Sequence, residues 1–461
     1  MTKTAEIYSP DKRNMTKRAL ATAWPAMAES FFVTLAGMID TMMVSGLGTS
    51  AVAAVGLTTQ PKFISLTLFF GLNVAISALV ARRKGEERQE EANKVFLTAL
   101  ALAVALCAAV TVLFVALADP MMKLAGSDQY THKDAVAYFR IIEGGMIFNV
   151  LTMAINSAQR GSGNTRLSMY TNLTSSVVNV IFNAILIPKY QLVGAAVATV
   201  LGTVVSAGMA IFSITRRSSY VSVQLMRDRK LRPNKSDARS IWHLTYNTSL
   251  ENIAMRVGFL ATALIAARLH TDPAFSKDIF ALHNVEMQLL GLGFAFADGM
   301  QVAAIALTGE SLGAGRKQEA KDYGRICQRI GLVISVILSL LLLVGGRWFT
   351  GLFLNGETSM SRAELLAMGT EVNYFIMVIV LLQISQIIFS ACLRAAGDVR
   401  YTLVGALISV AGIRTAVTLL LFFFTDLGLI GVWIGILSDQ LSRFLLMGHR
   451  FRKGNWVNLK I

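Results

Sequence analysis

Twelve long apolar segments, divided by short polar stretches, make up nearly the whole chain. Each is long enough, at roughly 20 residues or more, to cross the hydrocarbon core of a bilayer as a single α-helix. The pattern therefore predicts an all-α membrane protein with twelve transmembrane helices. The predicted spans are 18–45, 51–80, 93–117, 135–158, 166–187, 193–215, 240–268, 279–308, 325–346, 366–392, 401–424 and 429–447.

The two halves of this pattern resemble each other in sequence. Residues 71–92 align without a gap to residues 299–320. Single residues outside this segment also match: Glu29 with Glu251, and Arg160 with Arg394. Six spans in each half bring both copies into the membrane in the same sense, so the pseudo-symmetry axis should run along the membrane normal.

This repeat predicts two pseudo-symmetric six-helix bundles around a central cleft. Rocking of such bundles exposes a site in the cleft to either side of the membrane in turn. The chain is thus expected to divide into an N-lobe, a basic cytoplasmic linker and a C-lobe: residues 1–215, 216–239 and 240–461.

Composition and charge agree with a membrane protein. Hydrophobic residues make up 54% of the chain, charged residues only 15%, and the mean hydropathy is +0.55, which excludes an ordinary soluble domain. The net charge of +15 does not indicate a nucleic-acid partner, because the basic residues form short clusters between the apolar segments. No GxxxxGK[ST] motif occurs, so the sequence gives no basis for an ATP-driven pump.

The distribution of Lys and Arg predicts the orientation in the membrane. The amino-terminal stretch and every second loop after it hold 31 of the 43 basic residues, whereas the intervening loops hold 6. Because basic residues are retained on the cytoplasmic side, both termini and the linker should be cytoplasmic in a multi-pass protein of the cytoplasmic (inner) membrane. Membrane lipids are the expected surroundings, and a monomer is the expected state.

The first span carries the residues from which a mechanism can be inferred. Two carboxylates, Glu29 and Asp40, lie within it. A carboxylate at bilayer depth costs roughly 2.5–3.5 kcal/mol on insertion scales, so it is rarely present without a function. The two are eleven residues apart, about three helical turns, and so share one face. Pro25 removes a backbone N–H and is the predicted hinge of a gate coupled to an ion.

Several short motifs follow one another in a fixed order along the chain. They are Pro25, Asp40-Thr41 and Gly46-Leu47-Gly48 in and after the first span, Tyr138-Phe139-Arg140-Ile141, Arg160-Gly161-Ser162-Gly163-Asn164-Thr165, Asn179 and Asn183, Gly313-Ala314-Gly315, and Leu393-Arg394-Ala395-Ala396-Gly397-Asp398. Together they resemble those of multidrug and toxic compound extrusion (MATE) transporters, within the larger MOP flippase superfamily. The resemblance implies a secondary antiporter, not an enzyme, that exports amphipathic or cationic organic compounds in exchange for H⁺ or Na⁺ and needs no other cofactor.

Asp40 is the first candidate for cation coupling. A carboxylate in a low-dielectric setting can bind and release a proton, or ligate Na⁺ when other oxygens surround it. Asn179 and Asn183, one turn apart in the fifth span, can supply hydrogen bonds or amide oxygens, and the resemblance places them near Asp40. One branch of the family has an aspartate at the second of these positions, which leaves H⁺ and Na⁺ both open here. Alternatively, Asp40 is a structural partner of Lys62 in the second span.

A second polar set lies in the C-lobe. With Glu29, it supplies the secondary candidates for cation binding: Glu251, His283, Glu286 and Gln383. His283 and Glu286 are three residues apart and face one side of a helix, where they can share a proton. Glu251 can instead pair with Arg256. In the sodium-coupled branch, carboxylates stand where this chain has Met255 and Gln383, so a copied sodium site is not expected in this lobe. No metal site is predicted, apart from possible Na⁺ at Asp40.

The alternative function within the same superfamily is a flippase for lipid-linked precursors or polysaccharides. Such a protein would need a cationic cleft for phosphate groups, and Lys62, Arg256 and Arg414 are the residues that would provide it. If these side chains line the cleft without carboxylate partners, the flippase is favoured.

Overall fold

The computed structural model describes residues 12–47, 49–216, 219–266, 269, 273–353 and 360–459. Within these ranges the chain is helical throughout, apart from short turns and connections. The helices are α1 (Lys12–Ser45), α2 (Thr49–Gly85), α3 (Gln89–Ala116), α4 (Ala118–Leu124), α5 (His132–Gly144), α6 (Met146–Gly161), α7 (Thr165–Thr215), α8 (Val223–Asp228), α9 (Lys235–Ala266), α10 (Pro273–Gly313), α11 (Lys317–Phe353), α12 (Arg362–Ala395), α13 (Val399–Ala406), the π-helix η1 (Leu407–Arg414), α14 (Thr415–Phe424), α15 (Gly428–Lys453) and the short 3₁₀ helix η2 (Asn455–Asn458).

The predicted all-α membrane fold is confirmed. Nine helices in the described ranges are long and apolar enough to cross a membrane, or ten if α5 and α6, bent by 44° at their junction, form one span. α7 contains the fifth and sixth predicted spans, which meet at Gln191 with φ 50° and ψ −130°. α9 corresponds to the seventh span, and it begins at Lys235 rather than at 240 because Asn234 accepts the backbone N–H of Ser236 and caps the helix.

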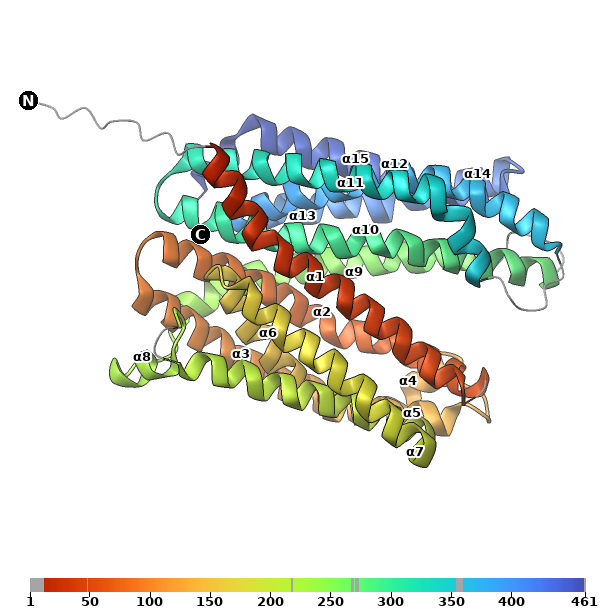
Figure 1. Cartoon of the computed structure of the whole chain (residues 1–461), viewed down its shortest axis with the longest axis horizontal. Coiled ribbons are helices and arrows are strands. Elements are labelled where there is room, and N and C mark those ends of the chain that lie inside the picture. Colours follow the sequence, from red (N-terminus) through yellow and green to blue (C-terminus); the bar gives the residue numbers. More distant parts are fainter. Residues whose placement is uncertain are drawn as a thin grey trace, which may run out of the picture.

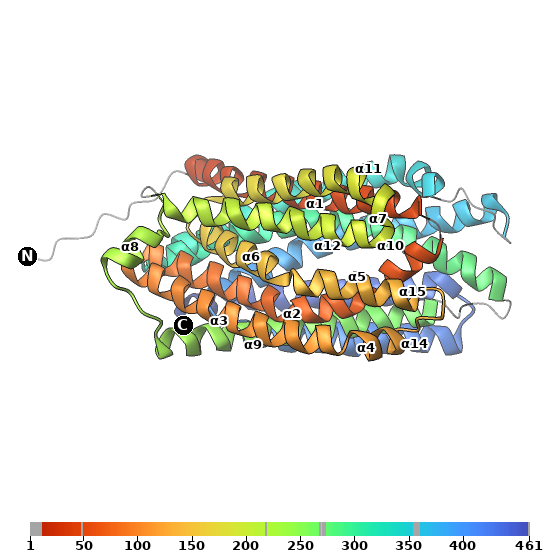
Figure 2. The ribbon, with the colours of Figure 1, turned by 90° about the horizontal axis from the view of Figure 1, so that it is seen from below.

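The helices form two bundles that lie side by side. Figure 1 shows α2 to α7 on one side and α10 to α15 on the other, with α1 crossing in front, and Figure 2 shows the helices running together along the long axis. The bundles meet where α1 packs on α10 and α2 packs on α9. Gly299 of α10 lies against the backbone of Met27, and Gly71, its partner in the repeat, lies against α9 at Thr245. The internal repeat is therefore also a repeat of helix packing.

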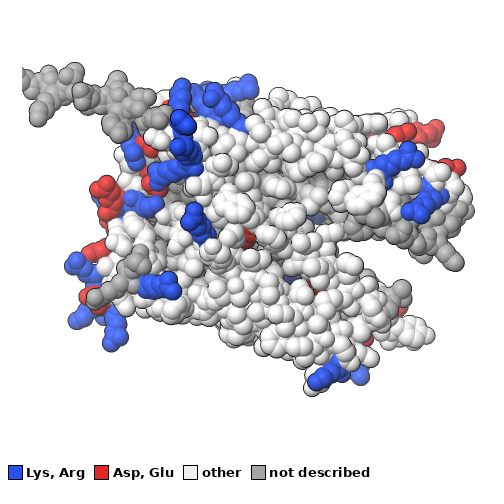
Figure 3. All heavy atoms as spheres, in the orientation of Figure 1, with Lys and Arg blue, Asp and Glu red and all other residues white. Residues whose placement is uncertain are grey.

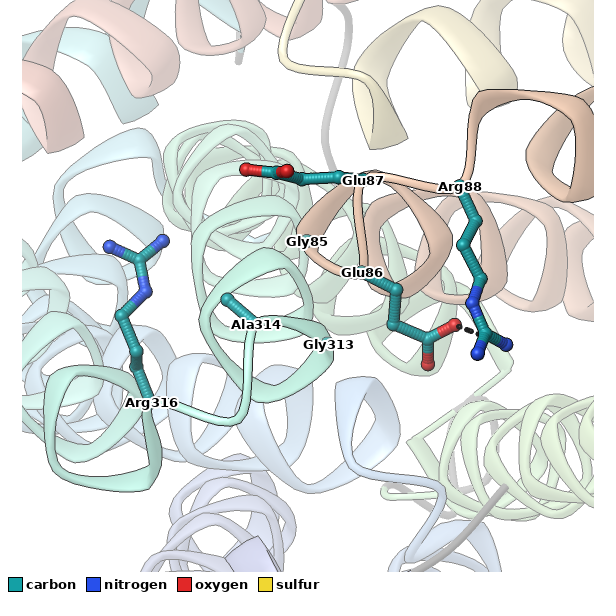
Figure 4. A pocket seen from close by; sticks show the side chains of 7 residues that line it. All are labelled: Gly85, Glu86, Glu87, Arg88, Gly313, Ala314 and Arg316. Carbon is teal, nitrogen blue, oxygen red and sulfur yellow. Dashed lines mark ion pairs between the residues drawn. The ribbon is translucent and has the colours of Figure 1, made fainter.

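At one end the bundles are closed by a contact between the last turns of α2 and α10. A Cβ at Gly85 would collide with the carbonyl oxygen of Glu310, and a Cβ at Gly313 would collide with that of Arg82. Glycine at both positions lets the two backbones touch, as small residues do between membrane helices. Figure 4 shows the two glycines at the ends of these helices, beside a shallow groove in which Glu86 points toward Arg88.

The opposite end is open. In Figure 3 the Lys and Arg side chains crowd at the left, where the bundles touch, and a broad middle band of the surface is almost uncharged. The right-hand end is hollowed by a deep notch between the bundles. The cleft is thus open at the end away from the basic cluster.

Candidate functional site

The three predicted coupling residues lie together between α1 and α7. Asn183 donates its side-chain N–H to Oδ1 of Asp40 and lies 3.4 Å from Oδ1 of Asn179. Asn179 in turn donates to Oγ1 of Thr199 at 3.2 Å. Asp40 is half-buried, whereas Asn183 is fully buried and its own Oδ1 has no partner within the described residues. The chain of amides therefore holds Asp40 from one side, and its other oxygen has no hydrogen bond to any residue that the structure describes.

The expected common face of Glu29 and Asp40 is present in the structure. Glu29 accepts a hydrogen bond from Asn172, and Asp40 accepts one from Asn183. Both contacts join α1 to α7, and both partners are eleven residues apart in their own helix. Two carboxylate–asparagine hydrogen bonds, about three helical turns apart, thus join α1 and α7.

The surroundings of the carboxylate differ between these two hydrogen bonds. Glu29 is buried and forms an ion pair with Arg160, and its second oxygen accepts from Ser168 at 3.0 Å. Since both oxygens of Glu29 are occupied, its burial is explained by a structural role. Asp40 has no ion pair in the described part of the chain and is the better candidate for a site that takes up a cation.

Lys62 of α2, the alternative partner of Asp40, does not bond to it. The ammonium lies within the electrostatic reach of Asp40 and of Glu143. Nevertheless, Lys62 Nζ forms no hydrogen bond and no ion pair closer than 4.0 Å with any described residue. Asp40 is therefore not locked against this amine.

The proposed ion pair between Glu251 and Arg256 is wrong. Glu251 accepts from Arg394 at 2.7 Å and from Thr402 at 3.0 Å, and Arg443 lies 3.7 Å away. Arg256 is exposed and lies over the ring of Phe63, 4.1 Å from its centroid. A spacing of five residues turns two side chains about 140° apart on a helix, so Glu251 and Arg256 point in different directions.

The Glu251 cluster is the counterpart of the Glu29 cluster. The repeat aligns Glu29 with Glu251 and Arg160 with Arg394, and both carboxylates accept from the aligned arginine. Each bundle thus contains a buried carboxylate paired with an arginine at the same place.

The other C-lobe candidates have separate surroundings. Glu286 is buried and accepts from Thr350 at 2.6 Å, whereas His283 lies edge-on to Trp433 at 5.7 Å. No hydrogen bond joins His283 to Glu286 in the described residues, so the structure does not bring them together as a pair. Gln383 is fully buried, and neither of its polar atoms has a partner there.

Of the three cations that would support a flippase, Arg414 has a carboxylate partner. It forms an ion pair with Asp439, and both side chains are buried. The π-helix η1 ends at this arginine, whose guanidinium also lies 4.4 Å from the ring centroid of Phe259. Lys62 and Arg256 have no carboxylate partner among the residues described.

Two fully buried intramembrane carboxylates were missed by the sequence analysis. Glu143 lies in the predicted span 135–158, and Asp439 in the span 429–447. Both are completely buried. An ionisable residue inside an apolar span is itself a sufficient signal of a functional or paired group, and this signal was available for both.

Two helical bundles around a cleft that is closed at one end, with an accessible intramembrane carboxylate, are the architecture of a multi-pass membrane transporter. Residues 25–185 and 248–420 match the MatE family model, so the chain belongs to the MatE family. The chain is 24% identical to the probable multidrug resistance protein NorM of Thermotoga maritima over 453 residues, which cover 95% of this chain and 93% of that one.

Solved structures share the fold. One is described as the outward-facing conformation of a multidrug resistance MATE family transporter of the MOP superfamily (TM-score 0.88, 23% identity, 99% of each chain). Another, from Pyrococcus furiosus, is described as a MOP superfamily transporter whose reversed binding-pocket polarity suggests a different function (TM-score 0.88, 23% identity, 96% of this chain and 97% of that one).

Proposed function

We propose that this protein exports organic compounds across the cytoplasmic membrane in exchange for protons, and that Asp40 is the proton-binding group. The observation that carries the proposal is the carboxylate of Asp40, which is held by Asn183 but not paired with a cation. A half-buried carboxylate of this kind is suited to gain and lose a proton within the transport cycle. The names of the relatives support an organic substrate.

A proton fits this site better than Na⁺. Sodium needs several oxygens around it, yet Asn183 presents its N–H, rather than its oxygen, to Asp40. The ammonium of Lys62 adds a positive charge within reach of the carboxylate, which opposes a second cation. A proton, in contrast, needs only the free oxygen of Asp40.

The cycle follows from the geometry. The cleft is open away from the basic end, which is cytoplasmic if the distribution of Lys and Arg sets the orientation, so this state faces outward. Protonation removes the charge that holds the Asn183 N–H, and the part of α1 beyond Glu29 is then free to move relative to α7. The predicted hinge, Pro25, lies before Glu29 and beside the contact of α1 with α10 at Gly299. Proton and substrate must prefer different states, because a ligand that binds both states equally shifts no equilibrium.

The test is efflux of ethidium from proteoliposomes in which a pH gradient or a Na⁺ gradient is imposed separately. The pH gradient should drive efflux, and Asp40→Asn should abolish it while ethidium exchange down its own gradient persists. Asp119→Asn, which changes a carboxylate in α4 outside the predicted spans, is the matched control and should behave as wild type. Full pH-driven efflux by Asp40→Asn would remove Asp40 from the mechanism, and efflux driven only by Na⁺ would replace the ion.

The second candidate is a transporter of anionic compounds, including lipid-linked phosphates. It is favoured by Lys62 and by Arg256, which is exposed and stacks on Phe63 without a carboxylate partner. The Pyrococcus furiosus transporter, with its reversed pocket polarity, raises the same question for another protein of this fold. Transport of fluorescein but not of ethidium, lost in Arg256→Gln, would establish this candidate in place of the first.

A further inference from the structure

Glu143 is a buried carboxylate for which the mechanism above has no use. It lies one residue before the end of α5, where the bend of 44° separates α5 from α6. Its Oε1 accepts from the hydroxyl of Ser65 on α2 at 2.9 Å, whereas Oε2 is buried without a hydrogen-bond partner in the described residues. Breaks in membrane helices are places where ions and substrates bind, because they leave polar groups inside the membrane.

Lys62 is the complementary unsatisfied group. The hydroxyl of Ser65 lies 2.8 Å from the backbone carbonyl oxygen of Lys62, so the Glu143 carboxylate faces the turn of α2 that begins at this lysine. The Lys62 ammonium, as described above, has no bonded partner. The Glu143 carboxylate, whose Oε2 lacks a donor, therefore faces the turn of α2 that carries the Lys62 ammonium, which lacks an acceptor. The electrostatic interactions of Lys62 join it to Glu143 as well as to Asp40.

We propose that Glu143 is the second carboxylate of the coupling site, and that Lys62 exchanges between Asp40 and Glu143 as the site takes up and releases its proton. This inference depends on the proposed proton coupling. With both carboxylates ionised, the three groups carry a net charge of −1, and one proton from the outer solution brings the site to zero. That proton bonds to Asp40, whose attraction for Lys62 disappears, and the ammonium then bonds to the free Oε2 of Glu143. Release of the proton toward the cytoplasm reverses the exchange.

Lys62 thereby turns a change of charge at Asp40 into a movement. Because Lys62 can pair with either Asp40 or Glu143, the pH at which the site takes up its proton is a property of the three residues together and not of Asp40 alone. The lysine also prevents the neutral state of Asp40 from leaving an unpaired ammonium in the membrane, which would be costly.

The surroundings of Glu143 contain few other titratable groups. Lys62 is the charged residue that faces it from α2, and Cys107 faces it from α3. On the other side of the set, Tyr138 of α5 lies within the reach of Asp40. The helices α4, α6 and α7 also pack against α5, and they bring no further charge to Glu143 among the described residues.

The inference can be tested without a substrate. Nitroxide labels are attached to the whole protein through Leu124→Cys on α4 and Val344→Cys on α11, whose side chains are 88% and 86% exposed in different bundles. The three native cysteines are buried and will not compete for the label. The distance between the labels across the cleft is measured by electron paramagnetic resonance in nanodiscs from pH 5 to pH 9. The pH at the midpoint of the change in distance is the readout.

Glu143→Gln should lower the midpoint by about one pH unit, because protonation of Asp40 then leaves Lys62 without a carboxylate. Adding Lys62→Met to this variant should return the midpoint to the wild-type value or above it. Ser65→Ala, which removes the hydrogen bond to Glu143 but no charge, should leave the midpoint within a few tenths of a unit. If Glu143 had only a structural role, Glu143→Gln would keep the wild-type midpoint, because glutamine still accepts a hydrogen bond from Ser65. Ser65→Ala, which removes that hydrogen bond, would then be the variant that shifts the midpoint.

A wild-type midpoint in Glu143→Gln, or a lowered midpoint that Lys62→Met does not restore, overturns the exchange of Lys62 while proton coupling stands. A wild-type protein without any response to pH overturns the proposed proton coupling itself. If Glu143→Gln does not fold, Lys62→Met alone decides: its midpoint should rise by about one pH unit, and an unchanged midpoint would refute the inference.

Discussion

An ion-pair bridge at the closed end should control how often the bundles separate there. Glu310, near the end of α10, accepts from Arg18 of α1 at 2.6 Å and from Lys84 of α2 at 3.1 Å. Lys84 also donates to the backbone carbonyl oxygen of Ser162, after α6, at 2.8 Å. One carboxylate of the second bundle is thus bonded to two cations of the first. An inward-open state requires both bonds to break.

The free energy by which these ion pairs stabilise the closed end follows from the exposure of their side chains. Arg18 is 44% exposed, Lys84 26% and Glu310 15%, so solvent screens both pairs partly. Exposed ion pairs contribute about 0.2–1 kcal/mol each, so two pairs that share one carboxylate should together stabilise closure by about 0.4–2 kcal/mol. Glu310→Gln should therefore raise the ratio of open to closed molecules at this end roughly 2- to 30-fold.

The distance between nitroxide labels at Val223→Cys in α8 and Gln318→Cys in α11 measures this ratio. Glu86→Gln is the matched control, because Glu86 lies at the same end of α2 but pairs with Arg83 of its own helix at 2.7 Å. Glu310→Gln should populate a longer distance, and Glu86→Gln should match the wild type. Equal distance distributions in the two variants would show that backbone packing alone closes this end.

Two further variants test packing and buried charge. Gly313→Ala should prevent closure of the same end, because the added Cβ would collide with a backbone carbonyl oxygen of α2. Gly291→Ala in the same helix is the control, because a Cβ there meets no atom within 4 Å and should not change the distance between the labels. Equal label distances in the two variants would refute the glycine contact. Glu251→Gln should destabilise the protein by about 3 kcal/mol or more and lower its unfolding temperature in detergent, since it leaves Arg394 buried without its carboxylate. Glu371 is exposed, so Glu371→Gln is the control and should leave this unfolding temperature unchanged. Equal unfolding temperatures for these two variants would mean that the buried pair contributes nothing.

The spans and the bundles could be predicted because hydropathy and repetition are properties of the chain itself. Where a helix begins or breaks depends on single contacts, such as the cap at Asn234, and this is why α9 begins several residues before the predicted span. Partners across helices could not be predicted reliably. Arg256 of the same helix was one of the alternatives considered for Glu251, yet its partner Arg394 lies 143 residues away. The repeat alignment equates Glu29 with Glu251 and Arg160 with Arg394, and it identifies Arg394 as the partner only once the contact of Glu29 with Arg160 is known.

The repeat also separates structural from functional carboxylates. The buried carboxylate–arginine pair occurs in both bundles, which is expected of a group that both folds need for packing. Asp40 does not recur in the second bundle. Continuing the alignment of Glu29 with Glu251 along the helix brings Asp40 opposite Thr262, whose hydroxyl donates to the carbonyl oxygen of Gly258 in its own helix. A carboxylate present in one bundle and absent from its copy is not required by the fold. Coupling through Asp40 would therefore move the first bundle alone, and the second would serve as the frame against which α1 shifts.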